Sequence, residues 1–140
     1  MNFRIIVGFI FVAVTLTSCS EYQKALRKND IKQMYELANS YYEAGDYVKA
    51  KRLYEVVAPK YAGRPQGERL NFFFANANFL TGTYFESSYQ FERFIKAYPN
   101  SDKREEASFL EAASYYKMSP RFSLDQTDTD TALQKLQSFI

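Results

Sequence analysis

The chain of 140 residues contains no histidine, which removes the commonest general base and the commonest metal ligand of proteins. A Ser-His-Asp triad and a Cys-His pair are therefore excluded, and a zinc site would have to combine one thiol with carboxylates. The five glycines are spaced too widely for a phosphate-binding loop. Acid–base catalysis by a pair of carboxylates is the chemistry that remains open.

Helical solenoids occur beside peptidoglycan-cleaving domains, which use a carboxylate as the general acid. Each candidate acid here is more simply explained as a solvated helix residue, and we expect no substrate-holding domain within these residues. We therefore predict that the protein is not an enzyme. The candidates weighed are Glu43, Glu86 and Glu106.

An acidic cluster, Asp125, Asp128 and Asp130, raises the question of calcium. The cluster lacks the glycine and the terminal glutamate of a calcium loop, and capping of a helix by Asp128 explains it better. We predict no metal site and no cofactor. The net charge of +2 comes from scattered basic residues, so nucleic acid is not an expected partner, and neither is a small-molecule substrate.

The single cysteine, Cys19, follows an N-terminal segment with the layout of a secretory signal peptide: Arg4, an apolar run over Ile5–Val14, and then small residues. The run is too short to span a bilayer, which needs about 20 apolar residues. The residues LTSC at 16–19 resemble the lipobox of bacterial lipoproteins, in which the cysteine becomes the lipid-bearing first residue. We predict a signal peptide over 1–18 and lipidation at Cys19.

The residues after Cys19 bear on location. Three acyl chains on the cysteine, as the lipobox implies, exceed what stable membrane attachment requires. Ser20 is not the aspartate that tends to retain such lipoproteins in the inner membrane, and no acidic surface-export run follows. We predict a lipid-anchored tether over 19–29 and a location at the outer membrane, facing the periplasm.

Three similar octets recur along the chain: YELANSYY at 35–42, FFFANANF at 72–79 and FLEAASYY at 109–116. Equivalent positions are separated by 72 − 35 = 37 and 109 − 72 = 37 residues. Such self-similarity is the signature of a repeat protein.

Around the first octet, apolar residues at helical spacing predict a helix from Ile31, capped by Asn29 or Asp30 and broken at Gly45. A second helix, capped by Asp46, is expected to end near Pro59. Ala38 and Ala50 are the small residues expected where these helices cross, as is Ala75 in the next unit.

The pattern restarts after Gly67, pauses at Gly82 and stops at Pro99. A third unit is expected to start at Ser101 or Asp102, with Asp102 and Glu105 forming a capping box. An insertion, PRFSLDQTD, should delay its second helix until about Asp128.

Paired helices joined by a glycine-containing turn, with a period near 34, are typical of the tetratricopeptide repeat. We predict an all-α, tetratricopeptide-repeat helical-hairpin solenoid over 30–140, with two full repeats at about 30–63 and 67–100 and an interrupted third at 102–140. The last predicted helix has an apolar side with no following repeat. We expect a longer intact protein or a cap supplied by a partner.

Three features together resemble the BamD family, lipoproteins of the outer-membrane β-barrel assembly machinery: the Cys19 lipobox, the segment KAYPNSDKREEA and the segment YYKMSPRFSLDQTDTDTA. The resemblance implies a non-enzymatic periplasmic scaffold that receives unfolded barrel clients and binds partner subunits. Members of the family have about five repeats, and this sequence has fewer than three complete ones. The alternative is another envelope tetratricopeptide lipoprotein, serving the division or peptidoglycan machinery.

In this type of repeat the first helices line the concave face, so the octets predict a groove for extended segments. Inter-repeat core is the other interpretation of the same aromatics. The predicted partner-binding residues are Tyr35, Asn39 and Tyr42 in the first octet, Phe72, Asn76 and Phe79 in the second, and Phe109 and Tyr116 in the third. Ala113 of the third octet occupies the position of Asn39 and Asn76.

Overall fold

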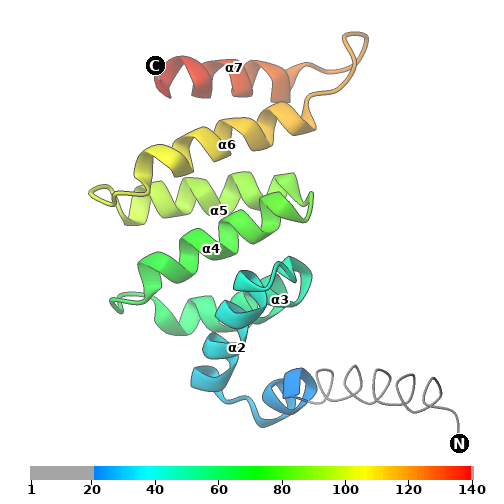
Figure 1. The fold of residues 1–140 in the computed structure, drawn as a ribbon. Helices are drawn as coiled ribbons and strands as arrows, with labels where there is room; N and C mark the ends of the chain where they lie inside the picture. The colour runs from blue at the N-terminus through cyan, green and yellow to red at the C-terminus, as the bar shows by residue number, and fades with distance from the viewer. Residues whose placement is uncertain (1–20, 140) are drawn as a thin grey trace, which may run out of the picture.

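The computed structural model describes residues 21–139, so the predicted signal peptide and Cys19 lie outside the described residues. The described residues form helices and no strand, and the helices stack as antiparallel hairpins (Figure 1). The elements are α2 (Ile31–Glu43), α3 (Tyr47–Val57), the short 3-10 helix η1 (Ala58–Tyr61), α4 (Gly67–Leu80), α5 (Tyr84–Ala97), α6 (Arg104–Met118) and α7 (Thr127–Phe139).

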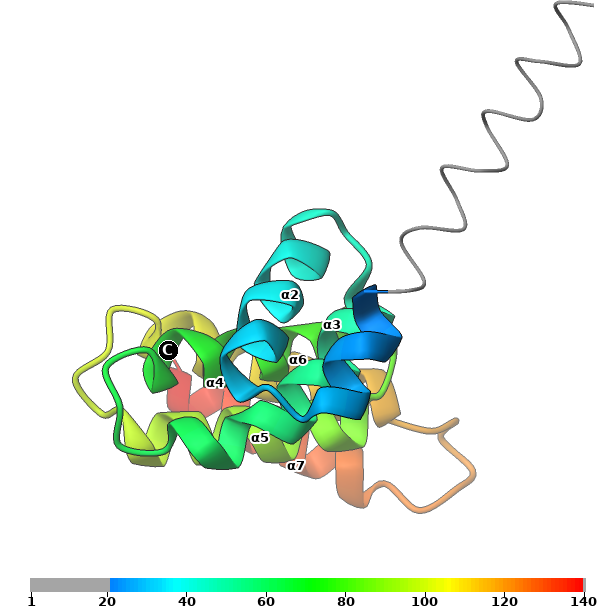
Figure 2. The same ribbon diagram turned by 90° about the horizontal axis from the view of Figure 1, so that it is seen from below.

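Each helix packs against the next one along the chain, and α4 also contacts α6. The hairpins α2–α3, α4–α5 and α6–α7 therefore follow one another along the stack, as Figure 1 shows. Seen along the stack in Figure 2, α4 and α6 lie toward one side and α5 and α7 toward the other. The predicted all-α solenoid of tetratricopeptide-type hairpins is confirmed. No helix within residues 21–139 is long and apolar enough to cross a membrane.

The first two hairpins begin and turn where the sequence predicts. Asp30 accepts a hydrogen bond from the backbone N of Gln33 at 3.1 Å, and Asp46 accepts one from the backbone N of Lys49 at 3.2 Å. These bonds satisfy amides that a helix start otherwise leaves without a partner. Gly45 and Gly82 adopt φ values of +80° and +76°, a region that glycine reaches without steric cost.

Two capping predictions in the third hairpin are wrong. Helix α6 takes Lys103 as its N-cap, one residue later than a capping box headed by Asp102 requires, so that carboxylate precedes the cap position. Helix α7 begins at Thr127, and Asp128 is therefore inside its first turn. Asp125 is the acceptor there, with its Oδ1 3.0 Å from the backbone N of Thr127.

Small residues allow the helices of each hairpin to approach closely. Ala38, Ala50 and Ala75 are fully buried, as predicted. Asn78 is buried at a position where the repeat pattern expects an aromatic residue. Its amide donates to the carbonyl of Phe74 at 2.9 Å and accepts from the Thr83 hydroxyl at 3.0 Å, so burial leaves its polar atoms satisfied.

Residues 21–28, within the predicted tether, are helical. Ala25 is fully buried in the core of the first hairpin, and the ring of Tyr22 meets that of Tyr41 edge-on at 6.0 Å. Asn29 follows with φ +50°, a left-handed conformation that commonly ends a helix. The part of the tether that the structure describes is thus packed on the solenoid.

Candidate functional site

Helices α2, α4 and α6 carry the three octets, and we call the surface they form the first-helix face. Tyr42 joins the first two octets on it. Its hydroxyl accepts a hydrogen bond from Asn76 Nδ2 at 2.6 Å, and its ring stacks on Phe73 with centroids 4.3 Å apart and planes 8° apart. The candidate residues of the first and second units are therefore in direct contact.

The first position of the octet has a different environment in each unit. Tyr35 is half-buried and stacks on Tyr61 at 4.8 Å. Phe72 is only 4% exposed and packs edge-on against core aromatics of α5. Phe109 is 47% exposed, with Phe139 as its neighbouring ring. Equivalent positions thus pass from core at the second unit to open surface at the third.

Of the other candidate positions, the last one of the octet also becomes more exposed in the third unit. Asn39 accepts a hydrogen bond from the Tyr54 hydroxyl at 2.8 Å, which fixes it within the first hairpin. Phe79 is half-buried and meets Tyr84 edge-on at 5.6 Å. Tyr116 is 65% exposed, and Ala113 is half-buried. The open aromatic surface of this face is concentrated on α6.

A cavity of about 390 Å³ opens on this face where α4 approaches the start of α6. Two cations stand over phenylalanine rings at its wall: Arg69 lies 4.9 Å from the centroid of Phe73, and Lys103 lies 5.4 Å from that of Phe72. Such contacts hold a positive charge against an apolar surface. The lining residues are Pro65, Glu68, Arg69, Phe72, Phe73, Phe94 and Lys103.

Each cation also has a carboxylate partner among the glutamates considered as acids. Lys103 Nζ lies 2.7 Å from Glu106, and Arg69 lies 3.3 Å from Glu43. All four side chains are exposed, so both pairs remain open to solvent and to competing charges. This part of the face therefore offers exchangeable positive charge beside aromatic surface.

The Tyr42 hydroxyl shares its surroundings with the start of α6. Burial raises the pKa of Tyr42, and the hydrogen bond from Asn76 opposes this rise. The charges of Glu106 and Lys103 also act on it. The ionisation of Tyr42 in the first unit thus responds to charges at the start of the third unit.

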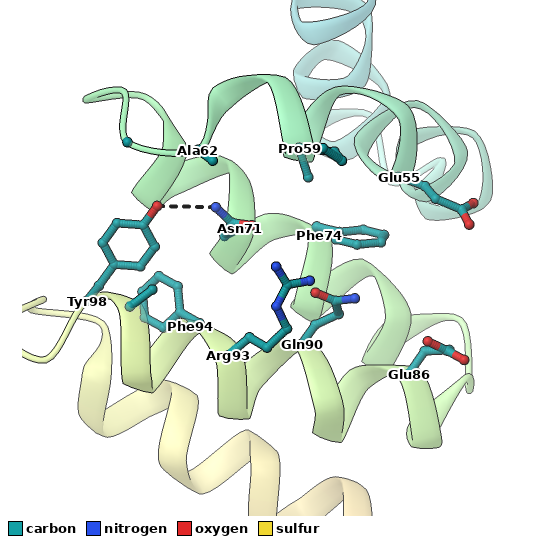
Figure 3. A pocket seen from close by; sticks show the side chains of 13 residues that line it. Glu55, Pro59, Ala62, Asn71, Phe74, Glu86, Gln90, Arg93, Phe94 and Tyr98 are labelled. Carbon is teal, nitrogen blue, oxygen red and sulfur yellow. Dashed lines mark hydrogen bonds between the residues drawn. The ribbon is translucent and has the colours of Figure 1, made fainter.

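A second cavity, of about 350 Å³, lies between the end of α3 with η1 on one side and α5 on the other (Figure 3). Arg93 and Gln90 project into it from α5, and Glu55 and Glu86 flank it. None of the predicted binding residues lines it. Glu86 therefore lines this second cavity. Glu106 pairs with Lys103, which lines the first cavity.

The arrangement suits recognition by contact. Within residues 21–139, no group of three or more histidine, cysteine, aspartate or glutamate side chains could hold a metal ion. What the first-helix face provides is aromatic area, amide groups and two cations, the components of a peptide-binding surface.

Sequence reasoning missed three residues of this site: Arg69, Phe73 and Lys103. Phe73 lies next to an octet position that was selected, so its contact with Tyr42 could have been considered. Arg69 is four residues before Phe73 on α4, so helical spacing could have suggested their contact. Lys103 could not be found by spacing, because it meets Phe72 only through the packing of neighbouring hairpins. For Lys103, a search for basic residues near the start of α6 is the available signal.

Comparison with known proteins gives a consistent result. The family model described as YfiO, outer membrane lipoprotein, matches residues 27–140. The putative outer membrane protein assembly factor BamD of Aquifex aeolicus (strain VF5) is 25% identical over 130 residues, which are 91% of this chain and 42% of that protein. The outer membrane protein assembly factor BamD of Pasteurella multocida (strain Pm70) is 22% identical over 138 residues, 96% of this chain and 53% of that protein.

The chain thus spans about half the length of the curated relatives it matches. The match to the family model covers the described solenoid from the end of the 21–28 helix through α7. This chain belongs to the YfiO family of outer membrane lipoproteins.

Proposed function

We propose that the protein is a non-enzymatic scaffold lipoprotein of outer-membrane β-barrel assembly, which binds unfolded barrel clients and partner subunits in the periplasm. The observation that carries this proposal is the family match over residues 27–140, together with two relatives named as outer membrane protein assembly factors. A solenoid of stacked helical hairpins with an aromatic face is an architecture that supports protein binding.

Client binding is assigned to the first-helix face. Extended segments of a barrel protein alternate apolar and polar side chains, and an aromatic surface with nearby cations can receive both kinds. Tyr116 and Phe109 supply exposed aromatic area on α6. Lys103 and Arg69 supply charges that can exchange their glutamate partners for a carboxylate of the client.

Attachment is assigned to Cys19, the only acyl acceptor of its kind in the sequence. A lipidated cysteine would hold the solenoid at the inner leaflet of the outer membrane. In a cell-fractionation experiment, Cys19→Ser is expected to leave the protein unprocessed or in the soluble fraction. A fully matured Cys19→Ser protein that remained in the outer-membrane fraction would contradict this assignment.

Affinity purification of the intact, tagged protein from detergent-solubilised outer membranes tests the proposed function. We expect the barrel-forming membrane subunit of the assembly machinery to copurify in near-stoichiometric amount. Recovery of division or peptidoglycan-synthesis proteins in its place would contradict the proposal and favour a scaffold of that machinery.

A further inference from the structure

The helical segment 21–28 presents its positive charge on the side away from the solenoid. Tyr22 and Ala25 face the first hairpin, where Ala25 is fully buried and Tyr22 meets the ring of Tyr41. Lys24, Arg27 and Lys28 are all exposed. At 3.6 residues per turn, these three lie within about 100° of one another around the helix, with Arg27 about opposite the buried pair and Lys28 nearest to Ala25.

This basic face lies at a defined place in the fold. In Figure 1 the segment is the blue helix at one end of the stack of hairpins, and α7 is at the other end. Lys24 is five residues after Cys19, so the intervening backbone spans at most about 18 Å even when fully extended. Lipidation of Cys19 would therefore hold the basic face close to a bilayer surface.

The charge of the segment suits an anionic surface. Residues 21–28, EYQKALRK, contain three basic residues and one acidic residue, Glu21. A basic residue near an anionic bilayer is attracted to it, an effect that decays within a Debye length. Three such residues on one helix face, next to an anchoring site, form a complementary contact.

We infer that the face formed by Lys24, Arg27 and Lys28 binds the anionic lipid headgroups of the membrane in which the protein is anchored. This inference rests on the proposed lipidation of Cys19. Contact through this face fixes the direction in which the packed helix, and with it the hairpin stack, leaves the bilayer. The lipid anchor alone would leave that direction open.

The test uses the full lipidated protein, reconstituted into phosphatidylcholine vesicles with or without phosphatidylglycerol. After flotation, an amine-reactive reagent labels exposed lysines, and mass spectrometry measures each site. We expect labelling of Lys24 and Lys28 to fall about threefold or more in the anionic vesicles. Labelling of Lys117, exposed on α6, should not change. Salt at about 1 M, where the Debye length is about 3 Å, should restore labelling.

A double variant, Arg27→Glu with Lys28→Glu, keeps Lys24 as the reporter. It should label equally in both kinds of vesicle, whereas the matched control Lys117→Glu should retain the protection of Lys24. Equal labelling of Lys24 and Lys28 in both vesicles, in wild-type protein that floats, would overturn the headgroup contact and leave the anchor standing. Protein that fails to float with either vesicle would overturn the anchor and this inference together.

Discussion

At the scale of single residues, equivalent octet positions differ in burial because their neighbours differ. Phe72 is enclosed by aromatics of α5, Tyr42 is stacked on Phe73, and Tyr116 is 65% exposed. The recurrence of these aromatics could be read from the sequence. Their burial could not, because it is set by side chains of neighbouring helices.

Tyr54 makes the fold sensitive to alkaline pH. Burial is the main cause that raises the pKa of Tyr54 well above the ordinary tyrosine value of about 10, and its hydroxyl donates to Asn39. As the pH rises, the Tyr54 hydroxyl therefore loses its proton in the unfolded chain before it does so in the folded protein. The contribution of Tyr54 to stability is fully present below about pH 10 and is lost as the pH rises further.

Tyr54→Phe is expected to lower the free energy of unfolding at neutral pH by about 1 kcal/mol, through loss of the hydrogen bond. It should also reduce the further loss of stability as the pH rises above about 10. Urea unfolding at a series of pH values measures both effects. The control is Tyr89→Phe, at a tyrosine that is 50% exposed. Parallel pH profiles for wild type and Tyr54→Phe would contradict this account.

At the scale of helices, the sequence predicted most starts and stops, because glycine turns and aspartate caps act locally. Local sequence signals did not predict the start of the third hairpin correctly. There the N-cap of α6 is Lys103 and not Asp102. The helix at residues 21–28 was also missed. Its short polar sequence has little periodicity, and packing of Ala25 and Tyr22 against the first hairpin stabilises it.

Cap usage can be tested with a matched pair of aspartates. Asp46→Ala removes the acceptor for the Lys49 amide and should cost about 1 kcal/mol of unfolding free energy. Asp102→Ala removes no cap and should change stability by less than about 0.5 kcal/mol. Chemical denaturation of both variants measures the difference. A cost at Asp102 equal to that at Asp46 would restore the capping box that the sequence predicted.

Helix crossings can be tested by enlarging a buried small residue. Ala75→Leu overpacks the contact of α4 with its neighbours and should cost on the order of 1 to 3 kcal/mol. Ala97→Leu, at an exposed position on α5, is the control and should be nearly neutral. An Ala75→Leu melting temperature equal to that of wild type would mean that this position is not a close helix crossing.

At the scale of the whole molecule, the repeat period and the all-α class followed from the sequence because each hairpin repeats the same local pattern. The cation and aromatic arrangement around Lys103 did not, because it is assembled from α4, α5 and α6. The proposed function therefore depends most on whether the first-helix face binds extended segments. Tyr42 and Phe79 are poor probes of this, since each packs on another ring.

The most direct measurement is a titration of the protein with a peptide copied from the last strand of an outer-membrane barrel protein. Tyr116→Ala, at an exposed octet position, should weaken binding by about 1 to 2 kcal/mol without lowering the melting temperature. Phe85→Ala, which removes a 72% exposed aromatic of α5 outside the octets, should bind like wild type. Wild-type affinity in a folded Tyr116→Ala protein, or equal losses in both variants, would contradict the assignment of client binding to the first-helix face.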